Sequence, residues 1–239
     1  MTNTPPRTRW RKRARQAAML LAIVAAIVLS WRWWSTYWRP DPAVWSMQGV
    51  AIGADNAPVS WPSLRSQGIG FAYVDATRGN GQSNPNFTRD HDGALSAGLR
   101  VGPIHHYRLC VTAMDQVAAF VRLVPRDEAA LPPLVMLDLD DTCPHQPTKA
   151  LLLSDLSTFL TQLETHMGKQ AVIAPSAAFE ARYYVASAIN RPLMIISPRA
   201  EPAPGSPAWV LWLANDRLAI SGSTGPTRLL VLGNQGVPQ

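Results

Sequence analysis

Apolar and polar residues follow two different patterns along this 239-residue chain, and the change falls near residue 40. The first part holds one uninterrupted apolar run, residues 17–29, and a cluster of tryptophan and tyrosine residues that ends at Trp38. The second part alternates short apolar runs with segments whose apolar residues recur every three or four positions. A long apolar run indicates a membrane or signal helix, whereas the alternation indicates the strands and helices of a globular domain.

From residue 48 onward, the pattern predicts strands separated by helices. The strands are expected at residues 48–52, 69–76, 100–107, 134–139, 170–174, 193–197, 209–213 and 229–232. The helices are expected at residues 61–66, 89–97, 112–123, 149–167 and 177–188. Regular alternation of strands and helices implies parallel strands joined by right-handed crossovers. Because the helices fade toward the C-terminus, we predict an α/β domain folded as an irregular β/α (TIM-like) barrel.

The distribution of charge excludes nucleic acid as a partner. The formal net charge is +6, but residues 1–39 hold eight of the 22 basic residues and no acidic residue. Residues 40–239 then carry 14 basic and 16 acidic side chains, a balance of −2. The high isoelectric point therefore describes the N-terminal tail, and the domain has no overall basic character.

The N-terminus predicts a membrane anchor. Six basic residues between Arg7 and Arg15 precede the apolar run, whose 13 residues are fewer than the roughly 20 that span a bilayer. The aromatic cluster extends the run, and Arg32 and Arg39 can reach the lipid headgroups from there. A cleaved signal peptide is the alternative, since 13 apolar residues also fit its central region. No small-x-small cleavage site follows the run, however, and bulky tryptophans stand in its place.

We therefore expect a single-pass protein of a bacterial inner membrane. Basic residues that flank a span remain in the cytoplasm, which places the domain in the periplasm. The expected division is a basic cytoplasmic tail at residues 1–16, a transmembrane anchor with an aromatic belt at 17–38, a linker at 39–47 and the barrel domain at 48–239.

The chain has two cysteines, Cys110 and Cys143. An exported domain can retain a disulfide, so the two are expected to pair; two buried free thiols are the alternative. In a parallel barrel the loops after consecutive strands lie side by side at one rim, and these cysteines follow consecutive predicted strands. Two cysteines without clustered histidines do not form a zinc site, and we predict no metal and no cofactor.

Carboxylates gather at the end of the predicted strand 134–139. Asp138 and Asp140 are two residues apart, so on a strand both would face one side, roughly 6.6 Å apart along it. Barrel enzymes build their active sites at the C-terminal ends of strands, and two carboxylates can divide into an acid and a base. The alternative is that these acids cap the turn that follows.

A series of short motifs in a fixed order carries a family resemblance. They are Val59-Ser-Trp61, Phe71-Ala-Tyr-Val-Asp-Ala-Thr-Arg-Gly79, Ala97-Gly-Leu99, Gln116-Val-Ala-Ala-Phe120, Leu131-Pro-Pro133 and Asp138-Leu-Asp140. Over residues 49–234 the chain resembles the family 25 glycoside hydrolases, the Chalaropsis-type lysozymes that cut peptidoglycan at N-acetylmuramic acid. The resemblance implies an irregular β/α barrel with its site at the C-terminal ends of the strands. Membrane-anchored bacterial members with cysteines at the places of Cys110 and Cys143 look most similar.

The departures from the family pattern fall where the chemistry is expected. Ala51 replaces the carboxylate of the opening Gly-Val-Asp motif, and the Lys-Ala-Thr-Glu segment becomes Asp75-Ala-Thr-Arg78, with both charges reversed. The Asp-x-Glu motif, whose glutamate is the general acid, is Asp138-Leu-Asp140, and aspartate is about 1.5 Å shorter in reach. Further replacements stand at Ile104, His106, Ala174, Met194, Leu213, Ala214 and Leu232.

The resemblance leaves Asp138 and Asp140 as candidate catalytic residues and His106 and Trp212 as candidate substrate contacts. Because so many site residues are replaced, we predict a catalytically impaired domain that binds the peptidoglycan glycan strand or an envelope protein. A working muramidase with Asp140 as general acid and Asp138 as base or stabilising group is the rival hypothesis. A scaffold with no affinity for glycan is a third.

Overall fold

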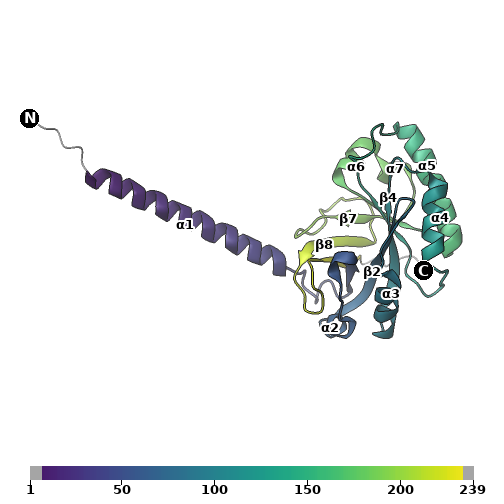
Figure 1. The fold of residues 1–239 in the computed structure, drawn as a ribbon, viewed down its shortest axis with the longest axis horizontal. Helices are drawn as coiled ribbons and strands as arrows, with labels where there is room; N and C mark the ends of the chain where they lie inside the picture. Colours follow the sequence, from purple (N-terminus) through teal and green to yellow (C-terminus); the bar gives the residue numbers. More distant parts are fainter. Residues whose placement is uncertain (1–6, 234–239) are drawn as a thin grey trace, which may run out of the picture.

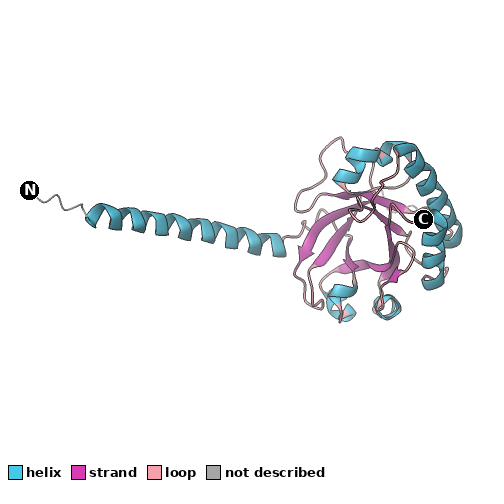
Figure 2. Cartoon of the chain, turned by 45° about the horizontal axis from the view of Figure 1, so that its top comes forward, coloured by secondary structure: helices cyan, strands magenta, loops and turns pink. Residues whose placement is uncertain are grey.

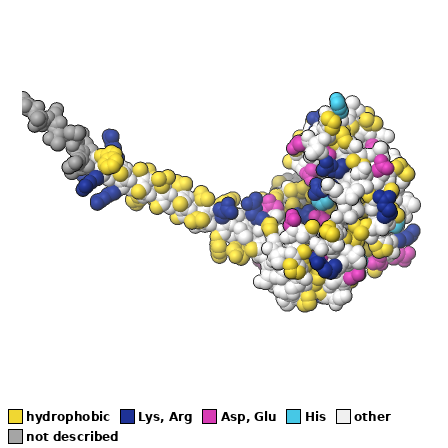
Figure 3. All heavy atoms as spheres, in the orientation of Figure 1, with side chains coloured by type: hydrophobic (Ala, Val, Ile, Leu, Met, Phe, Trp, Pro, Cys, Tyr) yellow, Lys and Arg dark blue, Asp and Glu magenta, His cyan; other side chains and the backbone are white. Residues whose placement is uncertain are grey.

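The computed structural model describes residues 7–233 and shows a long helix joined to a barrel domain (Figure 1). Helix α1, Arg7–Tyr37, carries the apolar run, and its segment Trp10–Tyr37 is long and apolar enough to cross a membrane. Apolar side chains are exposed along the helix, and basic side chains gather near both of its ends (Figure 3). Residues 1–6 of the expected cytoplasmic tail lie outside the described part of the chain.

Strands form a closed ring beside the long helix, as Figure 2 shows. Within residues 7–233 the ring contains β1 Gln48–Ile52, β2 Ile69–Arg78, β4 Arg100–Tyr107, β5 Leu134–Leu137, β6 Val172–Pro175, β7 Met194–Ile196, β8 Leu211–Leu218 and β9 Thr227–Leu232. Their order is β6-β5-β4-β2-β1-β9-β8-β7, and a bridge between Ile173 and Leu193 closes the ring. The short strand β3, Gln82–Ser83, pairs with the end of β2 off this path. The predicted irregular β/α barrel is confirmed.

The last strand corrects one expectation. β9 runs antiparallel to both of its neighbours, β1 and β8, whereas the alternation of elements predicted parallel strands throughout. Residues 219–226 between β8 and β9 form turns rather than a helix, and a short connection of this kind joins antiparallel strands. This hairpin makes the barrel irregular.

Helices cover the outside of the barrel. They are α2 Trp61–Ser66, α3 Phe87–Ser96, α4 Ala113–Leu123, α5 Lys149–Met167, α6 Ala177–Tyr183 and α7 Val185–Ala188. The bounds predicted for α2 and α5 are observed; α5 begins where the Thr148 hydroxyl accepts from the amide of Leu151 and ends at Gly168, whose φ is 70°. The single helix expected at 177–188 is divided because Tyr184 adopts a left-handed conformation, with φ of 54°.

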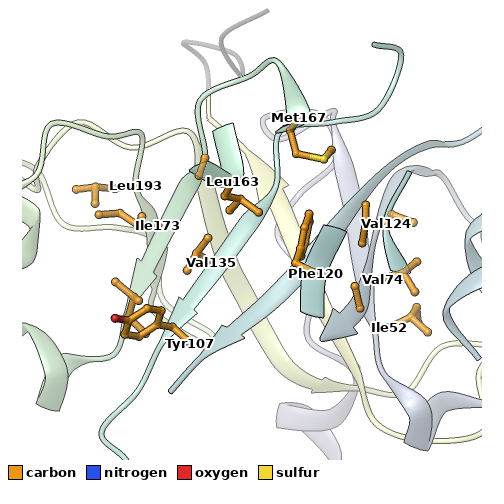
Figure 4. Close-up of a cluster of buried hydrophobic side chains, with 14 of the residues drawn as sticks. Ile52, Val74, Tyr107, Phe120, Val124, Val135, Leu163, Met167, Ile173 and Leu193 are labelled. Atoms are coloured by element: carbon orange, nitrogen blue, oxygen red, sulfur yellow. The ribbon is translucent and has the colours of Figure 1, made fainter. Parts of the chain in front are cut away.

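Apolar side chains pack on both sides of the strands. On the outer side, Val135 on β5 packs with Phe120 of α4 and Leu163 of α5 in one continuous layer (Figure 4). The inner side fills the barrel with a second layer, which we call the inner layer. Its buried members are Ala51, Phe71, Tyr73, Ile104, Leu131, Leu134, Met136, Val172, Ala174, Met194, Leu211, Leu213 and Leu230.

The last turn of α1 is built into the barrel. The side-chain amide of Asn215, fully buried on β8, donates to the carbonyl oxygens of Ser35 and Trp38, each at 2.9 Å. The backbone amide of Ala219 donates to the carbonyl oxygen of Thr36 at 2.9 Å. The last carbonyl groups of a helix have no partner inside the helix, so the barrel supplies the hydrogen bonds that end α1.

The segment expected as a linker also packs against the barrel. Arg39 donates from Nε and Nη2 to Oε1 of Gln48, at 3.2 and 2.7 Å, so it is held by β1 instead of reaching toward lipid headgroups. The ring of Trp45 packs edge-on against Trp212, with ring centroids 5.6 Å apart. The folded domain therefore begins within the last turn of α1.

Candidate functional site at the barrel mouth

Polar side chains line the mouth of the barrel, at the C-terminal ends of its parallel strands. Asp75 and His106 each stand two residues beyond an inner-layer residue of the same strand, so they face the same side one step closer to the mouth. Two adjoining hollows open here, with volumes of about 460 and 240 Å³. Asp75 lines the larger and Asp138 the smaller, and Arg78 and His106 line both. We call the two hollows together the mouth cleft.

Asp75 is the centre of an ion-pair cluster at the larger hollow. Nη2 of Arg228, on β9, donates to Oδ1 of Asp75 at 2.8 Å, and Nε2 of His106 lies 3.2 Å from the same oxygen. Burial alone would raise the pKa of the Asp75 carboxyl, but the contacts from His106 and Arg228 outweigh it and hold the pKa below its usual value. Asp75 is therefore an ionised group that binds its neighbours.

Asp140 is engaged on both of its carboxylate oxygens. Nε of Arg108 lies 2.7 Å from Oδ2, while the amide and hydroxyl of Thr142 donate to Oδ1 at 3.0 and 2.6 Å. Burial would raise the pKa of Asp140, but the hydrogen bonds from Thr142 and the guanidinium of Arg108 lower it below the usual value. A general acid must hold its proton near neutral pH, and this carboxyl is arranged to stay ionised. The alternative interpretation, a cap on the following turn, describes the contacts of Asp140.

Asp138 has different surroundings. Its side chain is exposed in the smaller hollow, next to Arg78 and Met136, and within residues 7–233 it forms no ion pair or side-chain hydrogen bond. The expectation that the two carboxylates stand on a strand is wrong, because β5 ends at Leu137 and both acids follow it in the loop, although both line the smaller hollow. The sequence spacing therefore does not define an acid–base pair on a strand.

Buried polar groups hold Arg108 in place. Gln116 accepts a hydrogen bond from the Arg108 amide at 2.9 Å and donates to its carbonyl oxygen at 3.1 Å. The ring of His105 is fixed between Gln116, 3.1 Å from Nε2, and the hydroxyl of Thr77, 2.8 Å from Nδ1. Burial lowers the pKa of His105 to about 4, so the ring is neutral at neutral pH. These contacts fix the start of the loop that carries Arg108 toward Asp140.

Positions that depart from the family pattern meet inside the barrel. Seven of the replacements are apolar. Five of them are buried in the inner layer, Ala51, Ile104, Ala174, Met194 and Leu213, while Leu232 packs against this layer and Ala214 is buried on the outer side. Ala51 is 2% exposed and Ile104 is fully buried. The interior beneath the mouth cleft is therefore filled by mutually packed apolar groups.

Trp212 does not lie with the other candidate site residues. Its side chain is fully buried on the outer side of the barrel, against Trp38 and Trp45, and its Nε1 donates to the carbonyl oxygen of Ser197 at 2.9 Å. Binding a sugar requires an exposed ring face, which Trp212 does not offer. Of the candidate substrate contacts, only His106 lines the mouth cleft.

The disulfide Cys110–Cys143 is present, with a Cα–Cα distance of 5.5 Å, so the predicted pairing is confirmed. It joins the loops that follow β4 and β5, the same two loops that the Arg108–Asp140 contact joins. This side of the mouth is thus closed by a covalent and an ionic link. Among the described residues, no three side chains of His, Cys, Asp or Glu come together as metal ligands.

The sequence patterns did not identify three residues of the mouth as site residues: Arg108, Thr142 and Arg228. Thr142 had a signal, because a threonine two residues after an aspartate is common in capped turns. Arg228 had none, since it lies 153 residues from its partner Asp75 and on a strand that no helix precedes. Only the closure of the barrel brings these two side chains together.

The chain is similar to known proteins in both sequence and fold. A model of the glycosyl hydrolases family 25 matches residues 52–222. The uncharacterized protein YegX of Escherichia coli K12 is 24% identical over 200 residues, covering 77% of this chain and 69% of that protein. The solved structure of a family 25 glycosyl hydrolase from Bacillus anthracis aligns with a TM-score of 0.74 at 23% identity, over 84% of this chain and 94% of that one. A bacterial lysozyme from Streptomyces coelicolor aligns with a TM-score of 0.71 at 19% identity, over 79% and 92%.

Proposed function

Because the chain belongs to glycosyl hydrolase family 25, we propose that it is a membrane-anchored, lysozyme-like protein of the cell envelope whose catalysis is impaired or lost. In this proposal α1 crosses a bacterial inner membrane and the barrel faces the periplasm. The barrel binds the glycan strand of peptidoglycan, or an envelope protein that presents similar groups, at its mouth cleft.

The state of Asp140 carries the proposal. This residue stands at the position of the family's general acid, and it is held ionised by Arg108 and Thr142. Protonating the leaving oxygen of a glycosidic bond requires a carboxyl whose pKa is raised, as by an apolar or like-charged environment. Asp140 has the opposite environment and a shorter side chain. Both differences reduce its capacity to act as an acid.

The inner layer supports the same conclusion. Where the family has a carboxylate, Ala51 packs among apolar side chains, and the neighbouring replacements pack with it. These residues fill the interior together, which is the pattern of a repacked core and not of a single lost group. Restoring one polar residue would bury it without a partner, so the catalytic arrangement cannot return by one substitution.

The anchor is supported by the way α1 ends. A signal peptide is removed from the mature protein, whereas Ser35 and Trp38 at the end of α1 bond to the buried Asn215 of the barrel. The apolar segment leads directly into these residues without a break in the helix. A helix continuous with the fold favours an uncleaved anchor over a signal sequence. The disulfide agrees with a location outside the cytoplasm.

The mouth cleft supplies groups suited to a polar ligand. Its larger hollow, of about 460 Å³, lies within the usual range for ligand sites. Arg78 is exposed in this hollow and Asp138 in the smaller one, and amide and hydroxyl groups of Gln82 and Ser83 line the larger hollow. Hydroxyl and amide groups of a saccharide can bond to such donors and acceptors.

The rival function is a working muramidase in which Asp138 and Asp140 share the chemistry. This function requires the carboxylate of Asp140 to leave the guanidinium of Arg108 and contact the substrate. Loss of the guanidinium would raise the pKa of the Asp140 carboxyl. The two hypotheses give opposite results in a single comparison, because only the rival needs Asp140 for turnover.

The deciding experiment measures cleavage and binding of purified peptidoglycan. Full-length protein in detergent is used, since the last turn of α1 belongs to the barrel. We expect sedimentation with peptidoglycan, but release of reducing ends no faster than from a sample without enzyme. Asp140→Glu, which restores the reach of the family's acid, should stay inactive while Arg108 holds the carboxylate.

Two outcomes would contradict the proposal. Rapid muramidase activity that disappears in Asp140→Asn would establish the rival function. Absence of both cleavage and binding, with a folded protein by circular dichroism, would favour the scaffold without glycan affinity. Arg126→Gln, a change at an exposed residue after α4 that lines neither hollow of the mouth cleft, serves as the control for nonspecific charge effects.

A further inference from the structure

A separate hollow lies between the end of α1 and the hairpin that joins β8 to β9. Its volume is about 500 Å³. Thr36 and Tyr37 of α1 form one wall, and the hairpin forms the other with polar residues that include Arg217, Ser221, Ser223 and Thr224. We call this hollow the junction recess. Of the residues that line it, Pro226 alone also lines the mouth cleft.

The two walls of the junction recess are fixed to one another. The amide of Ala219 donates to the carbonyl oxygen of Thr36 at 2.9 Å, which joins the hairpin to the helix. The tip of the hairpin is tied to the barrel, because Gln67 donates to the carbonyl oxygen of Ser221 at 2.7 Å and Thr224 donates to that of Ala57 at 2.8 Å. The recess is therefore preformed and does not depend on a ligand to order it.

The aromatic residues of α1 set the depth of the recess in a bilayer. Trp31, Trp33 and Tyr37 are 61%, 67% and 55% exposed, and exposed tryptophan and tyrosine at the end of an apolar helix lie at the level of the lipid headgroups. Tyr37 is also part of the recess wall. This step rests on the proposed anchor: if α1 spans the membrane, the recess opens among headgroups.

One arginine lines the recess and a second stands one helical turn from its other wall. The side chain of Arg217 is 57% exposed, and its nearest acid, Asp216, lies 3.4 Å from its Nε. The same oxygen of Asp216 already accepts from Arg199 at 2.5 Å, so Arg217 keeps most of its five donors for another partner. On the helix, Arg32 lies one turn before Thr36 and on the same face.

We propose that the junction recess binds the phosphate of an anionic phospholipid headgroup. Arg217 is the main contact, since a guanidinium matches the geometry of phosphate oxygens, and Arg32 is the second. The hydroxyl of Ser221, an exposed residue of the recess, is available for the glycerol of the same headgroup. Because α1 and the barrel are joined to one another, such a lipid would fix the orientation of the barrel relative to the membrane surface, and with it the direction in which the mouth cleft opens.

The test uses full-length protein reconstituted in vesicles of phosphatidylcholine with a minor fraction of phosphatidylglycerol. Native mass spectrometry after mild detergent extraction counts the lipids that remain bound. We expect the parent to retain phosphatidylglycerol in preference to phosphatidylcholine, and Arg217→Gln to lose about tenfold of this preference. Arg122→Gln, on the far helix α4, should behave as the parent. Excess glycerol phosphate should not displace the lipid.

Two results would overturn the proposal, and they differ from one another. If Arg217→Gln and Arg122→Gln retain phosphatidylglycerol equally, while both stay in the vesicles after an alkaline wash, the headgroup site is wrong and the anchor stands. If the parent is removed from vesicles by the alkaline wash, the anchor itself is wrong and the headgroup site fails with it. Equal unfolding temperatures of the two variants exclude a folding defect as the cause.

Discussion

Nε of Arg108 lies 2.7 Å from Oδ2 of Asp140, and this contact joins the loop after β4 to the loop after β5. The Asp140 side chain is 6% exposed and that of Arg108 is 30% exposed, so the pair is largely withdrawn from water. The residue that the motif resemblance assigns to the family's acid is thus a member of an internal ion pair. We propose that this pair stabilises the rim of the barrel.

A double-mutant cycle on Arg108 and Asp140 should detect this role. Asp140→Asn leaves the Arg108 guanidinium without its charged partner, and Arg108→Gln leaves the Asp140 carboxylate without a cation. Each substitution should therefore lower the free energy of unfolding by about 2 kcal/mol. The double variant should lose less than the sum, with a coupling energy of about 1 kcal/mol. Urea unfolding followed by tryptophan fluorescence measures all four proteins. Additive losses would mean that the two side chains do not interact.

His105 should make the stability of the barrel depend on pH. Burial lowers the pKa of His105 to about 4 in the folded protein, against 6.5 for the exposed side chain. Below pH 6.5 the unfolded chain binds a proton that the folded protein does not, so stability should fall between pH 6.5 and pH 4 by about 3 kcal/mol. Urea unfolding across this range checks the slope.

The control for this prediction compares two histidines. His105→Gln replaces the ring by an amide that does not titrate, so the slope should flatten although the variant is less stable at pH 7. His145→Gln, at an exposed position, should retain the slope of the parent. An unchanged slope in His105→Gln would assign the pH dependence to other groups.

A single restored carboxylate should harm the protein without reactivating it. Ala51→Asp places a charge at a position that is 2% exposed among apolar side chains, which should cost about 3 kcal/mol or more and raise the pKa of the new carboxyl. Ala150→Asp, at an exposed position in the first turn of α5 that lines neither hollow of the mouth cleft, is the control and should be nearly neutral. Thermal unfolding measures the stability of each variant, and the reducing-end assay measures its activity. A stable, active Ala51→Asp protein would show that the interior still accepts the family's site.

Truncation should locate where the apolar helix ends and the fold begins. Removing residues up to 33 deletes the apolar run but keeps Ser35 and Trp38, so the remaining domain should unfold near the temperature of the parent. Removing residues up to 41 removes the ring of Trp38 that packs on Trp212, and leaves the amide of Asn215 without its two carbonyl partners. This truncation should lower the free energy of unfolding by several kcal/mol, on the order expected for a lost aromatic contact and two lost hydrogen bonds. Thermal unfolding of the two soluble fragments makes the comparison. Equal stabilities would mean that the helix end is only an attachment.

Many features of the chain could be predicted because they depend on local pattern. The bounds of α2 and α5 followed from capping residues and apolar periodicity, and the strand Arg100–Tyr107 followed from its apolar run. The disulfide followed from the rule that loops after consecutive strands share a rim. The antiparallel β9 could not be predicted in this way, because strand direction depends on the turns at 219–226, which carry no periodic signal.

The sequence by itself determined the barrel and the apolar N-terminal helix, because both depend on the type and spacing of residues along the chain. The loss of the family's site residues stays a prediction from the same motifs. Only the tertiary structure decided what the remaining residues do. It paired Asp140 with Arg108, joined Asp75 to Arg228 and buried Trp212 under the end of α1. These are contacts between segments far apart in sequence, and the charge state and accessibility of a side chain are set by such neighbours and not by its position in a motif.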